Sequence, residues 1–224
     1  LLKENKDEAK IFVTGNTVID ALFSVVDQNY QFENKLLKNL DYENKKIILL
    51  TAHRRENLGE PMENIFRAVS DLTEQLDDLL VIFPVHLNPV IRELSKKMLA
   101  DNDQIQLIEP LDYLPFVNLM ARSDLILTDS GGIQEEAPSL GKPVLVLRDT
   151  TERPEAVEAG TVLKVGTDYK EIYQQSLSLL TDAEEYKKRA AAVNPYGDGK
   201  AVKRIIAALD YHFNFNSKRP EDFI

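Results

Sequence analysis

The chain alternates short runs of apolar residues with longer segments in which apolar residues recur at helical spacing. The short runs are nearly continuous in Ile, Leu and Val, which is typical of strands buried on both faces of a sheet. We predict six such strands, at residues 45–52, 79–85, 104–110, 123–129, 142–149 and 160–166.

The segments between these runs have the spacing of amphipathic helices. Between the first two strands, one helical stripe contains Met62, Ile65, Phe66, Val69, Leu72 and Leu76, and Pro61 stands where a first turn tolerates proline. Further helices are predicted over residues 89–99, 113–121, 133–140 and 170–180. Repeated strand–helix–strand order predicts an α/β fold, a Rossmann-like doubly wound parallel sheet with helices on both faces.

Three regions are expected along the chain. Residues 1–44 form a lead-in, with a short strand at 11–15 and a helix from about Thr17. Residues 45–195 form the Rossmann-like domain, and residues 196–224 carry a final helix that follows a turn at 194–199. We find no internal repeat and no low-complexity linker.

Composition excludes several classes of function. The net charge of -10, from 27 basic and 37 acidic residues, disfavours binding to nucleic acid or to anionic lipid. The chain has no cysteine and only three scattered histidines, so no disulfide, no metal site and no cofactor are expected. The longest apolar runs are too short to span a bilayer, and the first ten residues are charged. A cytoplasmic protein is therefore expected. Its first residue is Leu1 and not methionine, which we interpret as an excised piece of a longer protein.

Chemically active side chains follow directly after the predicted strands. In open α/β sheets, ligands bind beyond the carboxyl ends of the strands, so these side chains should converge on one rim. In strand order, the residues that follow are His53 to Asn57, then His86, then Tyr113 and Phe116, then Asp129 to Gly132, and then Arg148 to Arg153.

The segment that begins at Asp129 carries the most chemistry. Asp129 or Ser130 is predicted to cap the following helix, and two glycines let a ligand approach the backbone. The exposed amides and the helix dipole suit a diphosphate, while Glu136 lies where it can accept ribose hydroxyls. An ordinary capped helix is the alternative.

The other candidates also have structural alternatives. His53 and one arginine are predicted to contact phosphate, unless 53–57 is a solvated loop with local ion pairs. For His86 the structural alternative to a ligand contact is a helix cap. Phe116 is a core residue unless it stacks on a base.

Four motifs together resemble one family. They are TAHRREN at 51–57, PVHLNP at 84–89, the block LTDSGGIQEEAPSLGKPVLVLRDTTERPEAVEAGTVLKVGTD at 127–168, and NPYGDGKA at 194–201. In order and spacing they resemble the non-hydrolysing UDP-N-acetylglucosamine (UDP-GlcNAc) 2-epimerases of bacteria. The similarity begins at about residue 13 and covers most of the chain.

The resemblance implies a two-lobed fold of the glycosyltransferase-B type, of which this chain matches the second lobe. Family members interconvert UDP-GlcNAc and UDP-ManNAc by eliminating UDP and adding it back. The resemblance implies that Ser130, Gly131 and Gly132 hold the diphosphate and that Glu136 binds the ribose. Phe116 would lie by the uracil.

The same resemblance implies that His53 and Arg153 support the departing phosphates. It also implies a second, regulatory UDP-GlcNAc contacted by Arg54, Glu56 and His86. The carboxylates that handle the proton at sugar C2 belong to the family's N-terminal lobe, which has no match here, so this chain alone is expected to be inactive. The final helix is expected to reach toward that lobe with its apolar face exposed, and the full-length protein to be a homodimer.

Three other functions remain open at this point. A UDP-sugar-dependent glycosyltransferase and a hydrolysing 2-epimerase share the same architecture, and a nucleotide-sensing module is the non-enzymatic alternative. HRREN together with RDTTERPEA favours the epimerase.

Overall fold

The computed structural model describes residues 1–223, and within this range six strands form a single parallel sheet. All six predicted strands are present and each is shorter than predicted, most of all the last two, which have three residues each. They are β1 (Lys46–Thr51), β2 (Leu79–Pro84), β3 (Ile105–Ile108), β4 (Leu125–Thr128), β5 (Val144–Val146) and β6 (Val162–Lys164). Their spatial order is β3-β2-β1-β4-β5-β6. The predicted doubly wound, Rossmann-like fold is confirmed.

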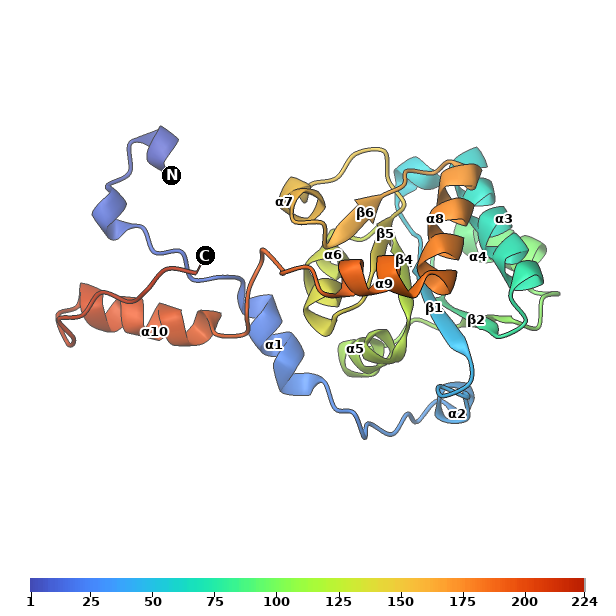
Figure 1. Cartoon of the computed structure of the whole chain (residues 1–224), viewed down its shortest axis with the longest axis horizontal. Coiled ribbons are helices and arrows are strands. Elements are labelled where there is room, and N and C mark those ends of the chain that lie inside the picture. The colour runs from blue at the N-terminus through green and yellow to red at the C-terminus, as the bar shows by residue number, and fades with distance from the viewer. Residues whose placement is uncertain (224) are drawn as a thin grey trace.

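Helices cover both faces of this sheet (Figure 1). One face is covered by α3 (Glu60–Gln75), α4 (Pro89–Leu99) and α8 (Tyr169–Thr181). The other is covered by α1 (Thr17–Val25), α5 (Tyr113–Arg122) and α6 (Gly131–Glu136). The remaining helices are α2 (Lys35–Lys38), α7 (Pro154–Glu158), α9 (Ala183–Ala190) and α10 (Ala201–His212).

The helix predicted over 133–140 differs in detail from the one observed. It begins two residues earlier, as α6, and continues from Ala137 to Leu140 as a 3₁₀ turn. Pro138 lacks the backbone N–H that an α-helix would need at that position, which accounts for the change in winding. The segment therefore begins directly after Ser130, where a ligand site was predicted.

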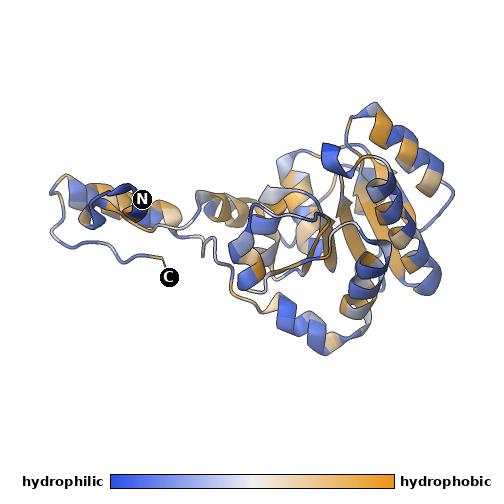
Figure 2. Cartoon of the chain, turned by 90° about the horizontal axis from the view of Figure 1, so that it is seen from above, coloured by the Kyte–Doolittle hydropathy of each residue, from blue (hydrophilic) through white to orange (hydrophobic). Residues whose placement is uncertain are grey.

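The core consists of two layers of apolar side chains, one on each face of the sheet. Figure 2 shows the strands as the most hydrophobic part of the chain and the helices as mixed. Side chains of β1 alternate between the layers, so that Ile48 and Leu50 pack under α3 while Ile47 and Leu49 pack under the opposite helices. Burial on both faces explains why these strands have continuous apolar sequences.

The register of the two central strands sets the height of the loops that follow them. Thr51 of β1 pairs with Thr128 of β4, and their hydroxyl oxygens are 2.6 Å apart. The chain thus leaves both strands at the same level. His53 and Asp129 are consequently brought to one edge of the sheet, as the positions of the motifs predicted.

The strand predicted at residues 11–15 does not form. In Figure 1 this segment lies beside α10, away from the sheet, so it has no neighbouring strand with which to form a ladder. It pairs instead with the irregular C-terminal tail. The Val13 amide donates to Asp222 (2.8 Å), the Phe223 amide donates to the Val13 carbonyl (2.7 Å), and Arg219 donates to the Ile11 carbonyl (2.6 Å).

The final helix, α10, projects from the main body together with this lead-in segment (Figure 1). Asp20 of α1 caps it, accepting hydrogen bonds from the Ala201 and Val202 amides, each at 3.0 Å. Its apolar residues Val202, Ile206 and Leu209 are exposed. Among the residues described, no helix has both the length and the apolar character needed to cross a membrane.

The packing between α3 and the sheet generates a stability prediction. Phe66 is fully buried, and its ring centroid lies 5.6 Å from that of Phe83 in β2. We expect Phe66→Ala to lower the free energy of unfolding by about 3–5 kcal/mol, because it leaves a cavity in the larger core layer. Urea unfolding measures the change.

Phe215 provides the control for this experiment. It is 81% exposed, so Phe215→Ala should change the free energy of unfolding by no more than about 0.5 kcal/mol. Equal losses in the two variants would contradict the assignment of the core.

Candidate functional site

The sheet reverses its direction of winding between β1 and β4. From β1 the chain crosses through α3 on one face to reach β2, whereas from β4 it crosses through α6 on the other face to reach β5. The two loops therefore leave the sheet on opposite sides and open a crevice at its carboxyl edge. Such a switch point is where open α/β sheets bind ligands.

Asp129 joins the two loops across this crevice. It is fully buried, and its Oδ2 accepts hydrogen bonds from the amides of His53 (2.8 Å) and Arg54 (2.8 Å) and from Nδ2 of Asn57 (3.1 Å). Its Oδ1 lies 3.1 Å from Nδ1 of His53. Burial alone would raise the pKa of Asp129, but the contact with His53 and the backbone donors outweigh it and lower that pKa. The carboxylate is thus held ionised.

The predicted helix cap at this position is therefore wrong for Asp129, whose side chain turns toward β1. Ser130 occupies the N-cap position of α6, yet within the described residues no side chain accepts from the first-turn amides. The first two residues of the helix are Gly131 and Gly132. These amides, at the positive end of the helix dipole, are the type of group that binds an anion.

Arg153 lies over the beginning of α6. An added Cβ at Gly131 would meet its guanidinium carbon at 3.9 Å. Arg153 forms an ion pair with Glu135, which also accepts a hydrogen bond from Nδ2 of Asn16 (2.7 Å). The guanidinium is therefore held beside the glycines, as the sequence predicted, by a neighbour that the sequence analysis did not single out.

His53 and His86 share one side of a cleft of about 200 Å³ at this edge. Their rings stack, with centroids 5.4 Å apart and planes 14° from parallel. Nδ1 of His86 accepts a hydrogen bond from the Asn88 amide (3.1 Å). The N-cap of α4 is Asn88, whose Oδ1 accepts from the Val90 amide (3.0 Å), so the capping alternative for His86 is wrong. The cleft is lined by Thr51, Ala52, His53, Pro84, His86, Pro110, Leu111, Phe116, Ser130 and Ile133.

Phe116 and Glu136 lie on the α5 side of the site. Phe116 lines the cleft and also packs against the core, while its stacking on a base stays a prediction. Glu136 accepts a hydrogen bond from the Tyr113 hydroxyl (2.9 Å). Burial raises the pKa of Glu136, with a further increase from the neighbouring Glu135 that the Tyr113 hydrogen bond only partly offsets. Burial and Glu136 together raise the pKa of Tyr113 to about 12.

The three residues predicted for a second ligand are not gathered in one cavity. Nε of Arg54 donates to the Asp129 carbonyl (3.2 Å), and His86 lines the cleft described above. Glu56 lines a different cavity of about 270 Å³, with Asn57, Pro61, Asp149, Thr150 and Thr167. Their shared role therefore stays a prediction.

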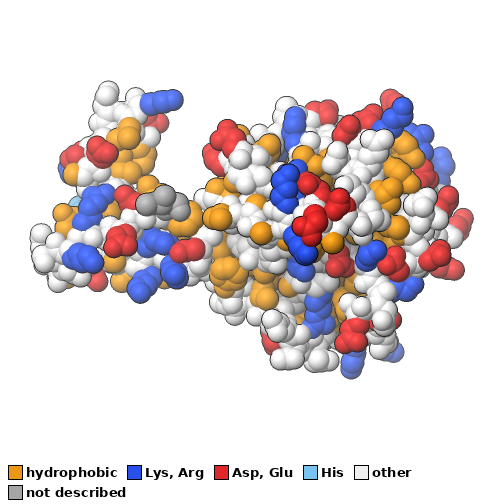
Figure 3. Space-filling model, in the orientation of Figure 1, with side chains coloured by type: hydrophobic (Ala, Val, Ile, Leu, Met, Phe, Trp, Pro, Cys, Tyr) orange, Lys and Arg blue, Asp and Glu red, His pale blue; other side chains and the backbone are white. Residues whose placement is uncertain are grey.

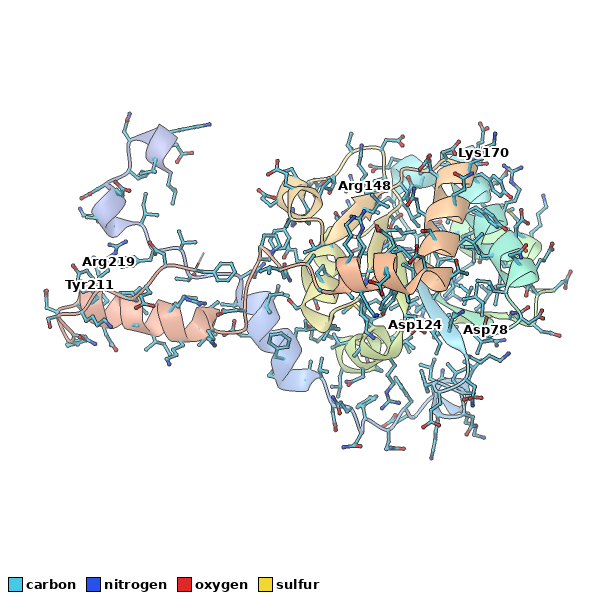
Figure 4. The ribbon with its side chains drawn as sticks, in the orientation of Figure 1. Asp78, Asp124, Arg148, Lys170, Tyr211 and Arg219 are labelled. Atoms are coloured by element: carbon cyan, nitrogen blue, oxygen red, sulfur yellow. The ribbon has the colours of Figure 1, made fainter. Side chains whose placement is uncertain are left out.

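Glu56 has a partner that the sequence did not suggest. It accepts a hydrogen bond of 2.7 Å from Nε of Arg148, a side chain that is only 5% exposed. Nη2 of Arg148 also lies 3.7 Å from Glu152. Arg148 follows β5 and lies at the opposite end of the sheet from Asp124 (Figure 4). It thus links the loop of His53 to the loop of Arg153.

Charges of both signs are mixed on the surface of the chain. On the face shown in Figure 3, acidic and basic side chains are interspersed and form no broad positive field. Among residues 1–223, no group of three or more metal-ligating side chains is assembled. An anion at this site would therefore be held by the helix amides, His53 and Arg153.

A family model described as UDP-N-acetylglucosamine 2-epimerase matches residues 1–210. The UDP-N-acetylglucosamine 2-epimerase of Bacillus subtilis is 56% identical over 223 residues, covering 100% of this chain and 58% of that protein. The S. aureus MnaA structure, solved with UDP, is 51% identical with a TM-score of 0.91, over 100% of this chain and 60% of that one.

A second solved structure, the UDP-GlcNAc 2-epimerase of Neisseria meningitidis bound to UDP-GlcNAc, is 47% identical with a TM-score of 0.80. The match covers 93% of this chain and 57% of that one. The chain thus spans less than two thirds of the length of the relatives it matches. Since the family model covers nearly all of the residues described, this chain belongs to the UDP-N-acetylglucosamine 2-epimerase family.

Proposed function

We propose that this chain is the UDP-binding lobe of a non-hydrolysing UDP-GlcNAc 2-epimerase with a two-lobed, glycosyltransferase-B-type fold. The observation that carries the proposal is the meeting of the β1 and β4 loops at the switch point, with His53 and Arg153 beside an uncapped, glycine-rich helix start. Family membership supplies the substrate class, since relatives were solved with UDP and with UDP-GlcNAc.

The diphosphate is proposed to bind at the start of α6. The first-turn amides of Gly131 and Gly132 point their partial positive charge along the helix axis toward the crevice. The Ser130 amide donates to Oγ1 of Thr128 (3.0 Å), so Ser130 is proposed to bind through its hydroxyl. Arg153 adds a full positive charge next to Gly131. Binding therefore depends on local donors, which suits a chain whose net charge is -10.

These same groups stabilise UDP as a leaving group. When the bond between the anomeric carbon and the diphosphate breaks, negative charge increases on the phosphate oxygens. Donors already in place, among them His53 and Arg153, stabilise this charge without reorganising. The C2 proton is lost as UDP leaves. Protonation of the intermediate at the opposite face of C2, with re-addition of UDP to C1, then gives UDP-ManNAc.

The nucleoside is proposed to lie along α5 and α6. Phe116 provides an aromatic surface in the cleft for the uracil ring, and Glu136 provides two oxygens for the ribose hydroxyls. Tyr113 holds the Glu136 carboxylate from the other side.

The second, regulatory UDP-GlcNAc contacted by Arg54, Glu56 and His86 remains part of this proposal. To bind this ligand, Glu56 would have to release its hydrogen bond from Arg148. His86 would contact the ligand from the wall of the cleft. A homodimeric whole protein in the cytoplasm also remains a proposal.

The reaction itself provides the first prediction here. The full-length protein, incubated with UDP-GlcNAc and followed by NMR, should form UDP-ManNAc. Free ManNAc with UDP would indicate a hydrolysing enzyme, and no change without an acceptor would indicate a glycosyltransferase; either would overturn the proposal. The 224-residue chain alone should form no UDP-ManNAc.

Gly131→Ala should separate ligand binding from stability. An added Cβ would make only ordinary contact with Arg153, at 3.9 Å, so the thermal unfolding midpoint should hold or rise slightly. The methyl group would instead stand where the diphosphate approaches. Affinity of the full-length protein for UDP should fall about tenfold or more, as isothermal titration calorimetry would show. Affinity for uridine, which has no phosphate, should not change.

Glu136→Gln should have opposite effects on stability and on binding. Because the folded-state pKa of Glu136 is raised, its protonated form stabilises the fold, and this contribution is lost as pH rises through that pKa. Glutamine stays neutral, so the variant should unfold at a higher temperature than the parent at pH 7.5. The difference should disappear as the pH falls through the raised pKa.

Binding of UDP by the full-length Glu136→Gln protein should weaken by roughly 10- to 100-fold, since hydrogen bonds from the ribose hydroxyls to a carboxylate are lost. Equal affinity of parent and variant would contradict the role proposed for Glu136.

A further inference from the structure

The two oxygens of the Asp129 carboxylate have different surroundings. Oδ2 accepts three hydrogen bonds, from the His53 amide, the Arg54 amide and Nδ2 of Asn57, at 2.8, 2.8 and 3.1 Å. These donors determine how the carboxylate is turned. Oδ1 is then directed at a single neighbour, Nδ1 of His53, at 3.1 Å.

The contact between Oδ1 and His53 is close but not aligned. Among the residues described, Oδ1 is buried without a donor that meets the geometry of a hydrogen bond. A buried, ionised oxygen in this state is costly, and a small rotation of the imidazole would bring its N–H into line. The structure therefore contains an acceptor directed at one ring nitrogen of His53.

One face of the His53 ring is covered by the ring of His86. The two rings stack at 5.4 Å, and His86 is itself held by the Asn88 amide. His53 is consequently fixed at its Nδ1 edge by Asp129 and on its face by a second ring. Nε2 is the nitrogen that remains for a ligand in the cleft.

We propose that Asp129 is a positioning residue that sets the tautomer of His53: it keeps a proton on Nδ1, so that Nε2 faces the ligand and donates to the phosphate when the ring is charged. An ionised carboxylate can only accept a hydrogen bond, so Nδ1 must carry a proton whether the ring is neutral or charged. The inference rests on the proposed function for its consequence, namely that Nε2 faces the diphosphate. The tautomer itself is independent of that function.

The substitution Asp129→Asn tests this proposal sharply, because its orientation can be foreseen. Three donors meet at the Oδ2 position, so the amide oxygen must occupy it and the NH2 group must face Nδ1 of His53. Two donors cannot face each other, so the proton of His53 should move to Nε2. The bonds that hold the loop are retained while the tautomer is inverted.

Nitrogen-15 NMR of the histidine rings in this chain reads the tautomer directly. The chain has three histidines, and His86→Gln and His212→Gln assign their signals. At about pH 9, the parent should carry the His53 proton on Nδ1 and Asp129→Asn should carry it on Nε2. A parent with the proton on Nε2, or a variant with the parental tautomer, would overturn the proposal.

Asp124→Asn is the matched control. Asp124 directly precedes β4, the strand that Asp129 follows, so the two residues lie at opposite ends of the sheet. Like Asp129, Asp124 binds the backbone of the β1 region, because its Oδ2 accepts a hydrogen bond from the Ile47 amide (2.7 Å). An asparagine there can keep that bond. This variant should leave the His53 tautomer and the rate of epimerisation unchanged.

Kinetics of the full-length protein test the consequence. Asp129→Asn should lower kcat on the order of 100-fold and change KM much less, and in a His53→Gln background it should have no further effect. An equal loss in both backgrounds would show a purely structural role and overturn the inference. If the parent protein does not epimerise UDP-GlcNAc, the proposed function fails, and the NMR result alone then decides whether Asp129 sets the tautomer.

Discussion

The arrangement of the whole site depends on one buried carboxylate between two parallel strands. Asp129 leaves β4 at the level where β1 ends, and it binds the backbone of the loop that follows β1. The two loops diverge toward opposite faces of the sheet, and this connection holds His53 close to the start of α6. Burial at 0% exposure makes the arrangement rigid, since an ionised group without its donors would be strongly disfavoured there.

Ion pairs around Asp129 join the remaining loops. Arg148 connects the loop of His53 to that of Arg153 through Glu56 and Glu152. Glu135 in turn connects Arg153 to Asn16 in the lead-in segment. Each of the cations proposed to meet the phosphates is therefore positioned by an acidic neighbour.

How much of this the sequence could predict depends on the range of each interaction. The strands and most helices were predictable because burial on one or both faces leaves a periodic pattern in neighbouring residues. The meeting of His53 and Asp129 at one edge was predictable because the carboxyl ends of parallel strands share an edge. The strand predicted at 11–15 fails because its apolar residues pack beside α10 and the tail. The partners of Asp129, Glu56 and Arg153 are more than a dozen residues away in sequence, and no periodicity records such pairs. Asp129 was accordingly interpreted as a helix cap, the local role that its position allowed.

Glu136 lies where the fold disfavours an ionised carboxylate, and such an unfavourable position can indicate a binding site. Its carboxylate lies in a partly buried position beside Glu135, and the resulting rise in pKa means that ionisation opposes folding. The Tyr113 hydroxyl compensates only in part, although a more basic neighbour could have done so fully. A cation beside Glu136 would, however, occupy acceptor positions of its carboxylate that the proposed ribose hydroxyls need. Glu136 has a single neutral donor, so acceptor positions remain for the ribose hydroxyls that it is proposed to bind.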